Sequence, residues 1–192
     1  MPNAKRLDLQ TIVKIVPEGA RVLDLGSGDG ELLAQLVQEK HVEARGVEIS
    51  ESNVRAAITK GLSVRHGNIE DGLADYRDGA FEYVVLSQTL AYLNQPTPVV
   101  REMLRVGKHA IISFDNAGYW RERGRALLGN GMGTTLTSGE PRVRAITLAQ
   151  FREFCASLGA AIEQAFFLSG HRAIAVLPSF RATIAVYVLR KS

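Results

Sequence analysis

The stretch Asp24-Leu25-Gly26-Ser27-Gly28-Asp29-Gly30 decides the fold of this 192-residue chain. It follows the apolar pair Val22-Leu23 and precedes the helix-like segment 31–37, an order typical of a strand, a glycine loop and a helix start. Glycines allow a ligand to approach the backbone closely, and the free N–H groups of a helix N-terminus favour negative charge. The pattern therefore predicts an anion-binding corner.

The spacing of the glycines narrows the choice of ligand. G-x-G-x-G differs from the dinucleotide motif G-x-G-x-x-G and from the phosphate loop, and the loop holds no lysine. Asp24 and Asp29 flank the loop, and their charges would repel a pyrophosphate. A ligand with one carboxylate and a nearby positive charge suits the loop better, and the methionine end of S-adenosylmethionine (SAM) has both.

Length and composition predict one domain over residues 1–192, with 46% hydrophobic and 22% charged residues as in ordinary globular proteins. The net charge of only +3 gives little support to a nucleic-acid partner, so we expect none. The single cysteine, Cys155, excludes an internal disulfide, and its helical context predicts a buried thiol. The first residues do not resemble a signal peptide, and no run reaches the ~20 apolar residues of a membrane span, so we expect a cytoplasmic protein without a membrane partner.

Strand-like and helix-like segments alternate along most of the chain. Strands are expected over 21–25, 43–49, 62–66, 80–86 and 109–114, helices over 7–16, 31–40, 51–60, 98–106 and 147–158, and a closing pair of strands over 160–168 and 182–189. This alternation predicts an α/β fold, a Rossmann-like doubly wound parallel sheet.

The segment 117–146 interrupts the alternation and is rich in glycine and arginine. A connection of this length inside a compact domain is typical of a lid or a binding loop. Arginines beside Tyr119 and Trp120 also resemble the residues that carry protein interfaces. We therefore expect a lid or interface insertion here, and a solvated lid is as compatible with the sequence as a docking surface.

Several residues follow the predicted strands at the edge where ligands of open α/β sheets bind. Glu48 lies 22 positions after Gly26, where an acid accepts hydrogen bonds from ribose hydroxyls, although a solvated acid would fit the same position. Asn68 and Ile69 could hold an adenine or form a simple turn, and Ser87 could contact the ligand or cap a helix. The residues expected to bind the cofactor are Asp24, Gly26, Ser27, Gly28, Glu48, Ile49, Asn68, Ile69 and Ser87.

The same edge offers few groups for catalysis. Methyl transfer from a sulfonium is a displacement that depends on positioning, and a base is needed where the acceptor must lose a proton. No acid follows the strand over 80–86, and Asp115 is the one acid placed to act as a base, with a capping or loop-pairing role as the alternative. The four histidines are scattered without metal-like spacing, so no metal is expected.

Several segments together resemble the MetW family of methionine biosynthesis proteins. The matching segments are Val22 to Leu33, Gly46 to Ile49, Phe81 to Leu90, Glu102 to Gly107, Ala110 to Phe114, and Asn116 with Trp120 and Arg121. The first two segments occur throughout SAM-dependent methyltransferases. Ser87-Gln-Thr-Leu90 followed by Glu102-Met-Leu-Arg-Val-Gly107 is more particular to MetW. The resemblance covers residues 7–125 well and the last third loosely.

The resemblance implies a class I methyltransferase fold with seven strands, the last antiparallel, and a pocket for SAM or S-adenosylhomocysteine lined by Asp24, Gly26, Gly28 and Glu48. It also implies a partner, the homoserine O-acyltransferase MetX, which the protein would support or regulate. The sequence departs from the family pattern at Asp115, at Asn68 and over 140–147, and the last change bears on the partner.

Two functions follow from these expectations. The first is a SAM-binding subunit that supports MetX, and the alternative is an active methyltransferase on a small-molecule acceptor. The sequence leaves the oligomeric state open, with a homodimer as one option.

Overall fold

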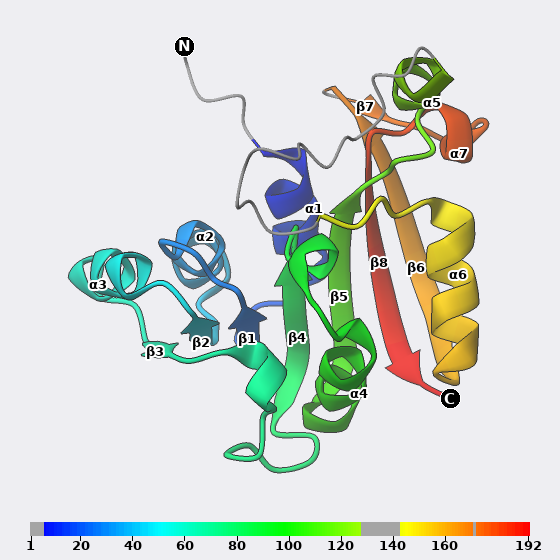
Figure 1. The fold of residues 1–192 in the computed structure, drawn as a ribbon. Helices are drawn as coiled ribbons and strands as arrows, with labels where there is room; N and C mark the ends of the chain where they lie inside the picture. Colours follow the sequence, from blue (N-terminus) through cyan, green and yellow to red (C-terminus); the bar gives the residue numbers. More distant parts are fainter. Residues whose placement is uncertain (1–5, 128–142, 171) are drawn as a thin grey trace, which may run out of the picture.

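A computed structural model describes residues 6–127, 143–170 and 172–192, and a single mixed sheet runs through them (Figure 1). The strands are β1 (Arg21–Leu25), β2 (Glu43–Glu48), β3 (Val64–His66), β4 (Phe81–Ser87), β5 (Gly107–Asp115), β6 (Ala160–Ser169), β7 (Arg172–Ala173) and β8 (Ile184–Lys191). All seven strands expected from the sequence are present. The described residues add an eighth, the two-residue β7 at the edge of the sheet.

The strand order is β3-β2-β1-β4-β5-β8-β6-β7. The five strands from β3 to β5 are parallel, and β8 runs antiparallel to both β5 and β6. The order reverses between β1 and β4, and such a switch point opens a crevice at the carboxyl ends of the strands. The glycine loop follows β1 directly, so the fold places it at that switch point.

Helices cover both faces of the sheet (Figure 1). They are α1 (Leu7–Ile15), α2 (Glu31–Lys40), α3 (Glu51–Thr59), α4 (Pro96–Val106), α5 (Trp120–Leu127), α6 (Leu148–Ser157) and α7 (Pro178–Arg181), with the 3₁₀ turns η1 (Ile69–Asp71) and η2 (Leu90–Tyr92). The five expected helices are confirmed, whereas α5, α7 and the two turns were not predicted from the sequence. No helix in the described part of the chain is long and apolar enough to span a bilayer.

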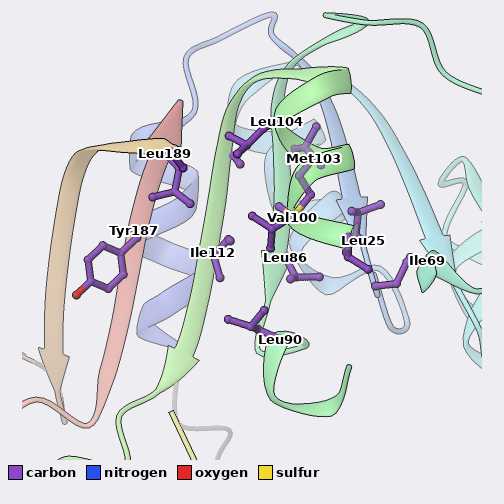
Figure 2. Close-up of a cluster of buried hydrophobic side chains, with 14 of the residues drawn as sticks. Leu25, Ile69, Leu86, Leu90, Val100, Met103, Leu104, Ile112, Tyr187 and Leu189 are labelled. Atoms are coloured by element: carbon purple, nitrogen blue, oxygen red, sulfur yellow. The ribbon is translucent and has the colours of Figure 1, made fainter. Parts of the chain in front are cut away.

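Two hydrophobic clusters fill the spaces between the sheet and its helices. Neighbouring residues of β4 face opposite ways, since side chains alternate along a strand. Val85 packs with Ile12 of α1 and Leu36 of α2, while Leu86 packs with Met103 of α4 on the other face (Figure 2). The sheet is therefore held rigidly on both sides.

The antiparallel part of the sheet has an aromatic core. The rings of Phe114 and Tyr187 each lie 4.7 Å from that of Phe151 on α6. Cys155 on the same helix is buried, as predicted, and burial raises the pKa of its thiol to about 11. This core fixes the end of β5 against β8.

The segment 117–146 is only partly described. It includes α5 and the residues from Val143 to Ile146, where Asn116 forms a parallel bridge with Ile146. Residues 128–142, which carry much of the expected lid or interface insertion, lie outside the described residues.

Candidate ligand-binding site

The glycine loop turns sharply after β1 because Gly26 and Gly28 adopt positive φ angles of 72° and 55°. A side chain at Gly26 would also collide with Thr89, since a Cβ atom there would lie 2.7 Å from Thr89 Oγ1. Nothing lies within 4 Å of the corresponding position at Gly28. Gly26 thus packs against the turn that follows β4, while Gly28 faces open space that a ligand could use.

Glu48 ends β2 and ties the loop to the neighbouring strand. Its Oε2 accepts a hydrogen bond from the Gly28 N–H (2.9 Å), and its Oε1 accepts one from the Ser50 N–H (2.9 Å). The side chain is only 7% exposed. A carboxylate has about four acceptor positions, so two remain for ribose hydroxyls. Glu48 therefore shapes the loop, and its contact with a ribose stays a prediction.

Asp24 is a buried carboxylate with incomplete hydrogen bonding. Its Oδ1, like the buried Oγ of Ser27, has no hydrogen-bond partner among the described residues. Burial raises the pKa of Asp24 to about 7, helped by the negative charge of Glu48 and opposed by Arg6. Unpaired buried polar atoms are costly and rare, and they are expected where a ligand supplies the partner.

Arg6 and Asp8 at the start of α1 complete this edge, and sequence reasoning missed both. Arg6 Nη2 donates to Asp8 Oδ2 (2.6 Å) and to Ser87 Oγ (3.3 Å). Asp8 is only 1% exposed, and its carboxylate also accepts a hydrogen bond from Ser87 Oγ. One feature of the sequence pointed to Asp8. It is an acid four residues before Ile12, so it lies on the buried, apolar face of the helix.

The predicted residue Ser87 ends β4, and the next residue, Gln88, has a strained backbone. Ser87 Oγ lies 3.2 Å from Ser113 Oγ, and the network with Asp8 shows that it does not cap a helix. Gln88 has a positive φ of 56°, which is uncommon for a residue with a side chain. Its N–H donates to both the carbonyl oxygen and the Oγ of Ser113. Such strain is found where the surrounding structure fixes a functional turn.

The residues expected near an adenine differ in how much of their surface is free to contact a ligand. Asn68 Oδ1 accepts a hydrogen bond from the Glu70 N–H (3.0 Å), so Asn68 caps η1 as a turn residue would. Ile69 belongs to the core, with little surface left for a ligand, whereas Ile49 is 64% exposed beside Glu48. The apolar surface available to a base thus comes more from Ile49 than from Ile69. Their contact with a cofactor stays a prediction.

Asp115 ends β5 and lines a cavity of about 470 Å³ with Arg6, Asp8, Gln88 and Arg144. Loss of surrounding water raises the pKa of Asp115, as does the negative charge of Asp8. Its position beside the other strand ends is compatible with the predicted base. Within the described ranges, no three His, Cys, Asp or Glu side chains gather in a way that could hold a metal ion.

The fold and the position of the glycine loop define a Rossmann-like class I methyltransferase fold. Similar solved structures include a SAM-dependent methyltransferase from Thermotoga maritima, with a TM-score of 0.70 and 18% identity, covering 96% of this chain and 87% of that one. A TehB-like SAM-dependent methyltransferase from Corynebacterium glutamicum has a TM-score of 0.68 and 17% identity, covering 100% and 90%. At these identities the likeness shows the fold alone.

The chain belongs to the MetW family. The family model described as methionine biosynthesis protein MetW matches residues 6–189. The bifunctional methionine biosynthesis protein MetXA/MetW of Rhodopirellula baltica is 34% identical over 176 residues, a match that covers 84% of this chain and 28% of that protein. The chain thus spans less than a third of the length of this relative. The resemblance inferred from the motifs is confirmed.

Proposed function

We propose that this protein is a SAM-binding subunit that supports or regulates a homoserine O-acyltransferase of the MetX type. The observation that carries the proposal is the relative from Rhodopirellula baltica, whose name joins MetXA and MetW in one protein. Fusion of two proteins is favourable when they act together, because the linker keeps the partners at a high effective concentration. For two separate chains, a binding interface would have to supply the same association.

The strand ends at the switch point support SAM as the ligand. Asp24 offers an unpaired carboxylate oxygen for the ammonium group of SAM, and the guanidinium of Arg6 lies close enough to influence Asp24 and could bind the carboxylate. Glu48 has acceptor positions left for the ribose. When bound, SAM carries an activated methyl group on a sulfonium. These residues of the chain would orient it by its two polar ends.

The end of β4 and the turn after it supply groups for binding and none for proton transfer. Ser87 ends β4 and is followed by Gln88 and Thr89, and none of the three is a base at neutral pH. SAM could then report the supply of methionine-derived metabolites to the partner enzyme. For SAM to change the activity of the partner, it must bind the free subunit and the complex with different affinities.

The proposal is tested with the acyltransferase from the same source, purified alone and together with this chain. We expect the two to co-purify, the rate of homoserine acylation to depend on this chain, and added SAM to change that rate. The Glu48→Ala variant should still co-purify but should lose the response to SAM. An acylation rate that is the same with and without this chain would rule out the proposed role.

Asp115 and its cavity favour one second candidate, a methyltransferase that acts on a small molecule. In that reaction the methyl group would pass from the sulfonium to the acceptor, Asp115 would take the proton that the acceptor loses, and S-adenosylhomocysteine would leave. Incubation with methyl-labelled SAM and a metabolite extract tests this candidate. Labelled product that disappears with Asp115→Asn would support it, and SAM binding without any labelled product would exclude it.

A further inference from the structure

The cavity beside the candidate SAM site is lined by residues outside the glycine loop. It encloses about 470 Å³ at the carboxyl edge of the sheet, between the start of α1, the turn after β4, the end of β5 and the segment from Val143 to Ile146. Figure 1 shows α1 next to the ends of β4 and β5. The volume lies within the range of small-molecule pockets.

Four charged side chains line this cavity, and two of them neutralise each other. Arg6 and Asp8 form an ion pair with an Nη2 to Oδ2 distance of 2.6 Å. Asp115 accepts no side-chain hydrogen bond within the described residues. Arg144 forms no ion pair there and donates only to the neutral carbonyl oxygens of Leu93 and Asn94. One negative and one positive group are thus left unpaired in the same cavity.

The two unpaired groups stand on segments that are joined to each other. Asn116, which follows Asp115, forms a parallel bridge with Ile146, and the Ala117 N–H donates to the Ile146 carbonyl oxygen (2.9 Å). On the other side, the Arg144 N–H donates to the carbonyl oxygen of Ala91 (2.8 Å). These bonds join the backbone segments that carry the two groups, and the bonds to Leu93 and Asn94 also hold the Arg144 guanidinium in place. A partly ordered site favours binding because less entropy is lost when the ligand binds.

The rest of the lining is largely apolar. Ala91, Val143 and Ile184 contribute aliphatic surface, and Tyr92 adds a half-exposed ring. The ligand therefore needs an uncharged side chain in addition to two opposite charges. Because Arg6 and Asp8 neutralise each other, the charges left to select a ligand are those of Asp115 and Arg144. Asp115 would repel a phosphate and Arg144 would repel a polyamine, whereas a ligand with one charge of each sign can pair with both.

We infer that this cavity binds a zwitterionic α-amino acid with a short apolar or thioether side chain. Its ammonium group pairs with Asp115, its carboxylate pairs with the free N–H groups of Arg144, and its side chain packs against the aliphatic wall. The site goes beyond the proposed SAM function and does not require SAM to be bound. The amino acid is either an effector or the methyl acceptor, and the same contacts serve both.

The test is calorimetric titration of the whole protein, without SAM, using L-methionine and L-leucine as probes. We expect one binding site for at least one of them. N-acetyl-L-methionine and L-methionine methyl ester, which lack the ammonium charge or the carboxylate, should bind at least ten-fold more weakly than L-methionine. Asp115→Asn and Arg144→Gln should each weaken binding at least ten-fold, whereas Arg144→Lys, which keeps the charge, should weaken it less.

A matched variant separates this site from other effects. Asp75→Asn makes the same chemical change at an exposed acid among the residues around Arg21, at the other end of the sheet, and should leave binding unchanged. Absence of binding by both probes at millimolar concentration would overturn the inference. Binding that Asp115→Asn leaves unchanged and that S-adenosylhomocysteine blocks competitively would also overturn it, since the probe would then occupy the glycine-loop site. Failure of SAM to bind would leave the amino-acid result unaffected and would count only against the proposed SAM function.

Discussion

The two edges of the parallel sheet use the same kinds of charged residues in opposite ways. At the carboxyl edge, burial raises the pKa of Asp24 and of Asp115, and Asp24 has an oxygen without a partner among the described residues. At the amino edge, arginines lower the pKa of Glu82 and of Glu102. Ionised acids that are stabilised contribute to folding, whereas destabilised acids cost stability and are characteristic of functional sites.

Two groups of charged side chains at the amino edge are well paired. Arg21 of β1 donates to Glu82 of β4 through Nη2 (2.7 Å) and Nε (3.0 Å), and its backbone N–H donates as well (2.9 Å). Arg105 likewise bridges Glu102 and Asp78. The contrast is one of burial: Asp24, a buried acid with an unpaired oxygen, lies at the carboxyl edge, which is where open α/β sheets bind ligands.

The largest expected effect on stability comes from Asp24→Asn. The folded-state pKa of Asp24 is about 7 against an ordinary value of 3.8, so ionisation of this acid favours the unfolded state as pH rises from about 4 to about 7. The variant should therefore be more stable than the natural protein above pH 7, by at most about 4 kcal/mol, with no difference below about pH 4. Urea unfolding at pH 4 and pH 8 measures both values. A variant that is less stable at pH 8 would show that Asp24 is well paired in the folded protein.

The next effect concerns affinity for SAM. Glu48→Ala removes the acceptor of the Gly28 and Ser50 N–H groups together with the proposed ribose contact. We expect the Kd for SAM to rise about 100-fold, or about 3 kcal/mol. Thermal unfolding serves as the control for folding, and Asp75→Asn as the matched control for a lost charge. An unchanged Kd in a folded Glu48→Ala protein would refute the assignment of the site.

A smaller effect on stability is expected from replacing Gly26, the loop glycine that packs against Thr89. Gly26→Ala introduces a Cβ at a φ of 72° and close to Thr89 Oγ1, which should cost about 2 kcal/mol of stability. Gly28→Ala has free space in the absence of ligand and should cost less in stability, while still weakening SAM binding. The double variant Gly26→Ala, Thr89→Ala should recover part of the loss. No recovery would show that φ alone sets the cost.

The smallest effect on stability is expected from a substitution at the amino edge. Glu82→Gln should lose about 1 kcal/mol of stability at pH 7, because ion pairs open to solvent are screened. Arg21 lowers the pKa of Glu82 to about 2, so this stability is present above about pH 4.5 and is lost as pH falls toward 2. The loss should shrink in high salt, and SAM affinity should not change. A drop in SAM affinity would mean that the two edges are coupled.

Much of the sheet could be predicted because periodicity is a local property of the sequence. The buried strand Phe81–Ser87 and the helix Pro96–Val106 have clear apolar patterns, and the glycine loop requires backbone conformations that few residues tolerate. The four-residue helix α7 has too few turns to show a period. The two-residue strand β7 is defined only by its pairing with β6, which no local pattern predicts.

The site was predictable only in part, because its unexpected residues meet through tertiary contacts. Arg6 and Asp8 reach Ser87 across 81 and 79 positions of sequence, a distance that no local pattern encodes. The strained backbone of Gln88 is likewise fixed by Ser113 on the neighbouring strand. Asp24 and Glu48 could be anticipated because Asp24 begins the glycine loop near the end of β1 and Glu48 is the last residue of β2.

The pH dependence of SAM binding to the natural protein decides whether the carboxyl edge of the sheet is a SAM site. If the carboxyl edge is built to bind SAM, calorimetry should show one molecule per chain, with an affinity that increases from about pH 6 to pH 7.5 as Asp24 becomes ionised while the ligand keeps its ammonium charge. Absence of SAM binding across this range, or an affinity that does not change with pH, would contradict the account.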